Sequence, residues 1–168
     1  TANKHVNPRL RRFRPDATPM AMRRKLGWER RTVLVATRNL EPVYGTNFLL
    51  EALPPVLKAR PDAALIVAGD GSQRACLEDL AGKLGIADAV RFIGYVPNGD
   101  LPGLLAEADY YVKATISDGT SRCMMEAFAC GLPCIVTDVP SIFEWMKEGV
   151  HGAVVRRSDG ADLARGIL

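Results

Sequence analysis

The sequence predicts an α/β protein with a doubly wound, Rossmann-like parallel sheet of about six strands flanked by helices. Short apolar, β-branched runs alternate along the chain with longer segments of helical periodicity. Such alternation is typical of right-handed crossovers, and these place consecutive strands parallel in one sheet. The 168 residues, of which 48% are apolar and 24% charged, suit one domain with a sizeable core.

Continuous apolar runs mark the predicted strands, which are residues 32–37, 63–68, 90–96, 108–114, 133–137 and 149–155. Apolar residues at helical spacing lie between them, and the predicted helices are residues 46–58, 73–84, 100–107, 141–148 and 159–168. A further short helix follows the polar loop 118–121 and ends at Gly131 and Pro133.

Residues 1–31 are predicted to be a linker segment that leads into the sheet domain, residues 32–168. Asn7 and Pro8 form a turn signal, and residues 20–28 have the pattern of a short amphipathic helix. Phe13 is expected to pack its ring onto the domain.

Positive charge is concentrated in this linker segment, although the net charge of the chain is only +3. The basic residues are Arg9, Arg11, Arg12, Arg14, Arg23, Arg24, Lys25, Arg30 and Arg31. Such a run is usually a solvated face. The segment has too few aromatic side chains for base stacking, so no nucleic-acid partner is expected, whereas peripheral contact with an anionic membrane stays open.

The sequence has no apolar run as long as a membrane span and does not open with the pattern of a secretory signal, so a cytoplasmic chain is expected. Its four cysteines, Cys76, Cys123, Cys130 and Cys134, lack the spacing of a zinc site. We expect them to be reduced and buried, and we expect no metal site.

One acidic residue, Glu126, lies in the otherwise largely apolar helix that follows the loop 118–121. Because a buried ionised carboxylate is costly, Glu126 needs a partner, and Arg122 one turn earlier is one candidate. A second interpretation is that Asp118, Thr120 or Ser121 is only an N-cap residue, and it is the favoured one for Thr120 and Ser121. The alternative is a ligand site, in which backbone N–H groups of residues 119–121 bind a phosphate and the two carboxylates accept sugar hydroxyls.

Two further groups of residues follow predicted strands. Arg38 ends the strand 32–37, where open α/β sheets bind ligands, so we favour a phosphate contact over a surface ion pair with Glu41. Gly69, Asp70 and Gly71 follow the strand 63–68. For these three residues a tight turn before a helix capped by Ser72 is at least as well supported as a phosphate loop, because the full dinucleotide motif is absent.

Residues 118–133 resemble the signature of the retaining family-4 glycosyltransferases, which have the GT-B fold. In that signature an acidic residue and seven further residues precede Glu-Ala-Met-Ala-x-Gly-x-Pro. Asp118 and Glu126 have this spacing, and Gly131 and Pro133 keep the register. Asp118 stands where Glu is usual and is one methylene shorter, as in a recurrent variant of the family.

The resemblance runs from about Asn7 to Leu168 and covers half of a GT-B enzyme. The family loop Gly-Arg-x5-Lys-Gly matches at Arg38 and Gly45, but Tyr44 stands in the place of the lysine. Either the Tyr44 hydroxyl or another cation would have to replace that lysine.

The resemblance implies a donor-binding domain that takes a nucleotide-diphosphate sugar, from which the enzyme transfers the sugar to a glycan, a lipid or a small molecule. Arg38 would hold the diphosphate, Glu126 would accept the ribose hydroxyls, and Asp118 would touch a sugar hydroxyl. The other implied donor-binding residues are Gly45, Gly69, Asp70, Gly71, Tyr95, Val96, Gly119, Thr120 and Ser121.

The family also implies a partner, the amino-terminal acceptor-binding domain of the same enzyme, and no metal or other cofactor. The isolated domain is then expected to transfer little sugar. The last predicted helix is expected to stop short of the helices that return to the partner domain. Two alternatives stay open: a non-catalytic nucleotide-binding module, and another GT-B enzyme such as a sugar-nucleotide epimerase. A Rossmann oxidoreductase is disfavoured by the missing dinucleotide motif.

Overall fold

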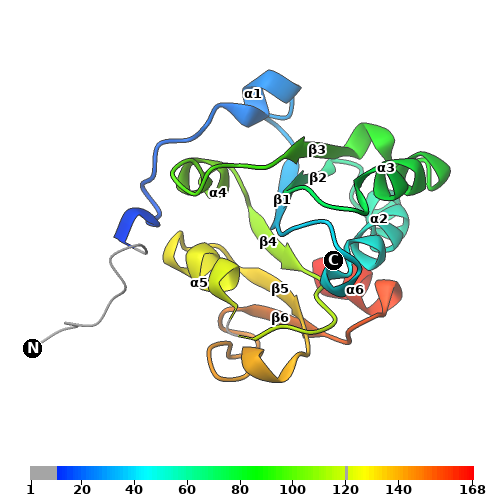
Figure 1. Cartoon of the computed structure of the whole chain (residues 1–168). Helices are drawn as coiled ribbons and strands as arrows, with labels where there is room; N and C mark the ends of the chain where they lie inside the picture. Colours follow the sequence, from blue (N-terminus) through cyan, green and yellow to red (C-terminus); the bar gives the residue numbers. More distant parts are fainter. Residues whose placement is uncertain (1–10, 120) are drawn as a thin grey trace, which may run out of the picture.

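The structure is a computed structural model that describes residues 11–119 and 121–168. Six strands form one all-parallel sheet in the order β3-β2-β1-β4-β5-β6, which confirms the predicted fold class (Figure 1). The strands are β1 Thr32–Thr37, β2 Ala63–Ala68, β3 Val90–Gly94, β4 Tyr110–Lys113, β5 Cys134–Thr137 and β6 Gly152–Val155. The strand order reverses between β1 and β4, where α/β sheets bind their ligands.

The helices lie in two layers, with α2, α3 and α6 over one face of the sheet and α1, α4 and α5 over the other (Figure 1). They are α1 Met22–Leu26, α2 Thr46–Ala59, α3 Arg74–Lys83, α4 Leu101–Leu105, α5 Arg122–Ala129 and α6 Gly160–Ile167. Single 3₁₀ turns are η2 Pro42–Tyr44, η3 Ala87–Ala89 and η4 Pro140–Ile142. None of these helices is both long enough and apolar enough to cross a bilayer.

Successive side chains of a strand point to opposite faces of the sheet, and this divides the core into two clusters. In β1, Leu34 contributes to the cluster beneath α2, α3 and α6, whereas Val33 and Val35 contribute to the cluster beneath α4 and α5. Every strand residue of β2 is buried, as expected for a central strand covered on both faces.

The segment before β1 packs against the sheet domain. Phe13 and Trp28 are both buried in the second cluster, so the prediction for Phe13 is confirmed. Arg23 donates to the Glu107 carbonyl and pairs with Asp109 at 2.6 Å, so part of the basic segment is neutralised by this domain.

The predicted helix 141–148 is wrong. After η4 the chain continues as turns, and its backbone bonds mostly span three residues. In a helix the amide of Lys147 would donate to the carbonyl of residue 143. Here that amide donates to Nδ1 of His151 at 3.0 Å, which closes a turn before β6.

The expectation of four buried thiols is wrong for Cys76, which is exposed on α3. Cys123, Cys130 and Cys134 are buried and free. Burial raises the pKa of Cys130 to about 11 and that of Cys134 to about 12, so these two thiols stay protonated and act as small apolar groups.

Candidate functional site

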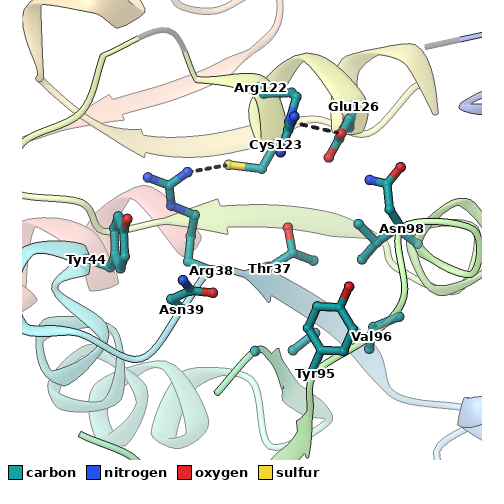
Figure 2. A pocket seen from close by; sticks show the side chains of 13 residues that line it. Thr37, Arg38, Asn39, Tyr44, Tyr95, Val96, Asn98, Arg122, Cys123 and Glu126 are labelled. Atoms are coloured by element: carbon teal, nitrogen blue, oxygen red, sulfur yellow. Dashed lines mark hydrogen bonds and ion pairs between the residues drawn. The ribbon is translucent and has the colours of Figure 1, made fainter. Parts of the chain in front are cut away.

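A cavity of about 570 Å³ opens at the carboxyl ends of β1 and β2, below α5 (Figure 2). Its walls come from the loop after β1, the end of β2, the loop after β3, and α4 and α5. The lining residues are Thr37, Arg38, Asn39, Tyr44, Ala68, Gly69, Tyr95, Val96, Asn98, Leu101, Arg122, Cys123 and Glu126. The cavity therefore lies at the edge of the sheet where the sequence predicted a site.

Arg38 projects across this cavity toward the start of α5 (Figure 2). Its guanidinium lies 3.1 Å from Oδ1 of Asp118 and 3.6 Å from Sγ of Cys123. Burial alone would lower the pKa of Arg38, but Cys123 and Asp118 outweigh it, so the pKa is raised and the charge is permanent. The alternative pair with Glu41 is not formed, because Glu41 accepts both the amide and the hydroxyl of Ser72.

Tyr44 supports the guanidinium of Arg38 from one side. The guanidinium carbon lies 4.2 Å from the centre of the Tyr44 ring, which is a cation–π contact (Figure 2). The 3₁₀ turn η2 presents this ring, and Gly45 follows it as the N-cap of α2. Tyr44 thus orients a charge instead of adding one.

Asp118 is a partly buried carboxylate between two cations. Oδ1 faces Arg38, and Oδ2 lies 2.9 Å from Nζ of Lys113, whose side chain is completely buried. Burial would raise the pKa of Asp118, but Lys113 and Arg38 together outweigh it and lower that pKa. Asp118 does not line the cavity, but Arg38, which it contacts, does.

Glu126 lies on the wall opposite Arg38, one turn into α5. Its residue exposure is 5%, and Oε1 is 3.7 Å from Nε of the exposed Arg122. Burial raises the pKa of Glu126, while Arg122, Asn98 and Arg12 partly offset this rise. The ion pair expected as one alternative is therefore present, but on the cavity wall and not on an exposed face.

The start of α5 differs from a capped helix. Ser121 occupies the N-cap position and is fully buried, but its side chain makes no capping hydrogen bond. Gly119 is exposed beside it, outside the cavity lining. The prediction for Thr120 lies outside the described residues.

The Gly-Asp-Gly segment, residues 69–71, crosses closely over the loop that follows β1. A Cβ on Gly69 would lie 1.9 Å from the carbonyl oxygen of Arg38, and one on Gly71 would lie 2.6 Å from that of Leu40. Asp70 accepts a hydrogen bond from the amide of Gly71 and does not line the cavity. Ser72 does not cap α3, because its hydroxyl donates to Glu41.

The cavity brings together five of the residues predicted from the sequence and leaves the others in its surroundings. The lining contains Arg38, Gly69, Tyr95, Val96 and Glu126. Gly45, Asp70, Gly71, Asp118, Gly119 and Ser121 lie outside it. Across residues 11–119 and 121–168, no three His, Cys, Asp or Glu side chains gather closely enough to hold a metal ion.

Sequence reasoning missed Asn98, Cys123 and Lys113. Asn98 follows Tyr95 and Val96 in the same loop, and no sequence motif marks it as a site residue. Lys113 had one: it is the only basic residue in the predicted strand 108–114, and Asp118 follows it closely in the sequence.

The sequence profile of the family described as "Glycosyl transferases group 1" matches residues 20–168. The chain belongs to the group 1 glycosyl transferases. A relative from Mycolicibacterium smegmatis, a GDP-mannose-dependent alpha-(1-6)-phosphatidylinositol monomannoside mannosyltransferase, is 32% identical over 160 residues, which are 90% of this chain and 41% of that protein. A second relative, from Corynebacterium glutamicum, is a GDP-mannose-dependent monoacylated alpha-(1-6)-phosphatidylinositol monomannoside mannosyltransferase. It is 34% identical over 95% of this chain and 44% of its own length. This group 1 domain thus spans under half of these relatives.

Solved structures show the same architecture. HepE of Anabaena in complex with UDP-glucose superposes with a TM-score of 0.77 at 26% identity, over 85% of this chain and 40% of HepE. The C-terminal domain of a group 1 glycosyl transferase from Francisella tularensis superposes with a TM-score of 0.80 at 20% identity, over 97% of this chain and 86% of that domain. The group 1 domain therefore has the fold of the carboxy-terminal half of a GT-B enzyme.

Proposed function

We propose that this domain binds a nucleotide-diphosphate sugar and forms the donor half of a retaining glycosyltransferase. The observation that carries the proposal is that Arg38 and Glu126, from the loop after β1 and from α5, line opposite walls of one cavity. A permanent cation and a carboxylate at the carboxyl edge of a parallel sheet suit a diphosphate and the hydroxyls of a ribose.

The proposed roles follow the chemistry of each group. Arg38 binds the diphosphate with two N–H donors, and Tyr44 holds its guanidinium plane. Glu126 accepts from the ribose hydroxyls, and the loop of Tyr95 and Val96 faces the base. Arg38 also stabilises the negative charge that develops on the leaving diphosphate.

The donor is tested by thermal shift and calorimetry of the chain with GDP, GDP-mannose, UDP, UDP-glucose and ADP, each with and without EDTA. GDP-mannose is the sugar nucleotide named for the Mycolicibacterium smegmatis relative, and UDP-glucose is the ligand in the Anabaena HepE structure. We expect one nucleoside diphosphate to raise the melting temperature, with no loss in EDTA.

Arg38→Met should reduce that affinity by about tenfold or more, since it removes a charge-assisted pair of hydrogen bonds. Arg60→Met is the control, because Arg60 forms an exposed pair with Asp62 away from the cavity. Equal effects of the two substitutions, or no binding of any probe, would contradict the proposal.

We propose that a second, amino-terminal domain holds the acceptor. The donor-binding domain described above then transfers little sugar when it is alone. The chain covers 41% of the Mycolicibacterium smegmatis relative, which leaves room for such a domain. Transfer by the isolated chain at the rate of an enzyme that contains both domains would refute this.

Peripheral contact with an anionic membrane is also proposed. Arg11, Arg12 and Arg14 surround a shallow hollow beside Pro102 and Gly103, and basic side chains of this kind attract anionic lipid headgroups. The proposal predicts pelleting with phosphatidylserine vesicles but not with phosphatidylcholine vesicles, and equal pelleting with both would end it.

A further inference from the structure

Lys113 is a buried lysine that the roles proposed above do not use. It ends β4 next to the point where the strand order reverses, and its side chain has no exposed surface. An ammonium group this deeply buried is costly unless a negative charge lies beside it. Within the described part of the chain its charged partner is Asp118, at 2.9 Å, in the geometry of an ion pair and not of an aligned hydrogen bond.

The cluster holds two positive groups and one carboxylate. Lys113 approaches Asp118 from β4, Arg38 approaches it from the loop after β1, and each cation faces a different carboxylate oxygen. Tyr44 and Cys123 lie against the guanidinium and contribute no cation. One positive charge is therefore in excess, and it belongs to Arg38, the member of the cluster that lines the cavity.

Arg38 contacts Oδ1 of Asp118 through Nη2, so a diphosphate bound by both terminal nitrogens of the guanidinium would compete with Asp118 for Nη2. When its N–H groups turn to the phosphate oxygens, Oδ1 of Asp118 loses a donor and becomes free to accept another hydrogen bond. Lys113 cannot follow, since it is enclosed in β4, and it stays on Oδ2. The carboxylate thus remains ionised and held at the moment when the sugar reaches it.

We propose that Lys113 is a positioning residue for recognition of the donor sugar: it fixes Asp118 through Oδ2, so that Oδ1 accepts a sugar hydroxyl once Arg38 has moved to the diphosphate. This inference rests on the proposed function. It assigns Lys113 to discrimination between a sugar nucleotide and the free nucleoside diphosphate, not to binding of the phosphates.

Lys113→Met tests the inference, because methionine has a similar length and no charge. We expect the preference for GDP-mannose over GDP, or for UDP-glucose over UDP, to fall by about tenfold, the effect of losing one charge-assisted hydrogen bond. Affinity for the free nucleoside diphosphate should change less than about twofold. Lys83→Met is the matched control, since Lys83 forms an exposed pair with Asp79.

A double-mutant cycle separates this role from a general effect on the fold. Lys113→Met leaves a partly buried carboxylate with one cation, whereas Lys113→Met with Asp118→Asn removes both charges and should recover much of the lost stability. If Lys113 acts through Asp118, the double variant has the same preference as Asp118→Asn alone. A further loss in the double variant, or equal losses for sugar nucleotide and free nucleotide, would overturn the inference.

A measurement without ligand keeps this result distinct from the proposed function. Carbon NMR of the Asp118 carboxyl should report a higher pKa in Lys113→Met than in the wild type and no change in Lys83→Met. Lys113 and Arg38 are the charged groups that face Asp118, with Cys123 and Tyr44 behind Arg38. If the pKa of Asp118 is unchanged in Lys113→Met, the proposed role of Lys113 is wrong even if a donor binds. If that pKa is raised but none of the probes binds, the proposed function is wrong instead.

Discussion

Glu126 is a carboxylate that α5 carries into the wall of the cavity, among neighbours that include the buried Cys123 and Ala127. Its partner Arg122 is mostly exposed and lies 3.7 Å away, so the pair screens the charge only in part. A buried acid with a raised pKa is typical of a functional site, because burial alone is unfavourable to the fold.

Glu126→Gln should therefore stabilise the ligand-free chain and weaken nucleotide binding. Because burial raises the pKa of Glu126 in the folded state, the folded chain is most stable when Glu126 is protonated. This contribution to stability is fully present below the pKa of Glu126 in the unfolded chain, and it is lost as the pH rises through the folded-state pKa. The glutamine variant should match the wild type near pH 4 and exceed its melting temperature by about 2–4 °C at pH 7.

Scanning calorimetry across this pH range measures the stability effect, and titration with the nucleotide found for the wild type measures the loss of binding. Arg122→Gln is the comparison, since it removes the exposed partner and leaves the carboxylate. A glutamine variant that loses stability at pH 7 would show that Glu126 holds the fold and is not a strained ligand group.

At the scale of elements, the site depends on a crossing between the loops that follow β1 and β2. Gly69 has φ +141°, and its α-carbon lies directly against the carbonyl of Arg38. The same crossing lets the amide of Arg38 donate to the carbonyl of Ala68. The backbone of Arg38, the residue proposed to bind the diphosphate, is thus held by the end of the neighbouring strand.

Gly69→Ala should lower the free energy of unfolding by about 2–3 kcal/mol, because a Cβ would clash with backbone and the φ value disfavours an L side chain. The control is Gly82→Ala in α3, where nothing lies within 4 Å of an added Cβ. There alanine should stabilise the helix by about 0.5–1 kcal/mol. Urea unfolding of both variants checks the pair, and similar free energies would contradict the crossing.

At the scale of the whole molecule, the segment before β1 is part of the same folded unit as the sheet. Phe13 and Trp28 fill the core cluster beneath α4 and α5 together with Val33 and Tyr111. Arg23 ties this segment to Glu107 and Asp109 at the start of β4. A linker that only entered the domain would not bury two aromatic rings in its core.

Phe13→Ala should cost about 3–5 kcal/mol of unfolding free energy, as truncation of a buried phenylalanine does. Phe143→Ala makes the same chemical change at a ring that is 61% exposed, and it should stay within about 0.5 kcal/mol of the wild type. Urea unfolding distinguishes them. A small effect at Phe13 would return this segment to the role of a loose linker.

The central strands were predictable because their pattern is local. The bounds of β1 and β2 equal the predicted ones, since both strands are buried on both faces and read as continuous apolar runs. β4 was predicted too long. The amide of Asp109 donates to the carbonyl of Val33, and the amide of Val33 donates to the carboxylate of Asp109. The pairing of β4 with β1 therefore begins only at Tyr110.

The sequence by itself determined the order of the six strands, the family and the two groups that face each other across the cavity. Arg38 ends a buried strand and Glu126 interrupts an apolar helix, and both signals are local. Only the tertiary structure decided what Asp118 does, because its partners depend on which strands are neighbours. Arg38 and Asp118 are 80 residues apart, and they meet because β1 pairs with β4. The buried Lys113, which ends β4, lies beside them for the same reason. The partner of a charged residue inside a strand can be identified only once the neighbouring strands are known.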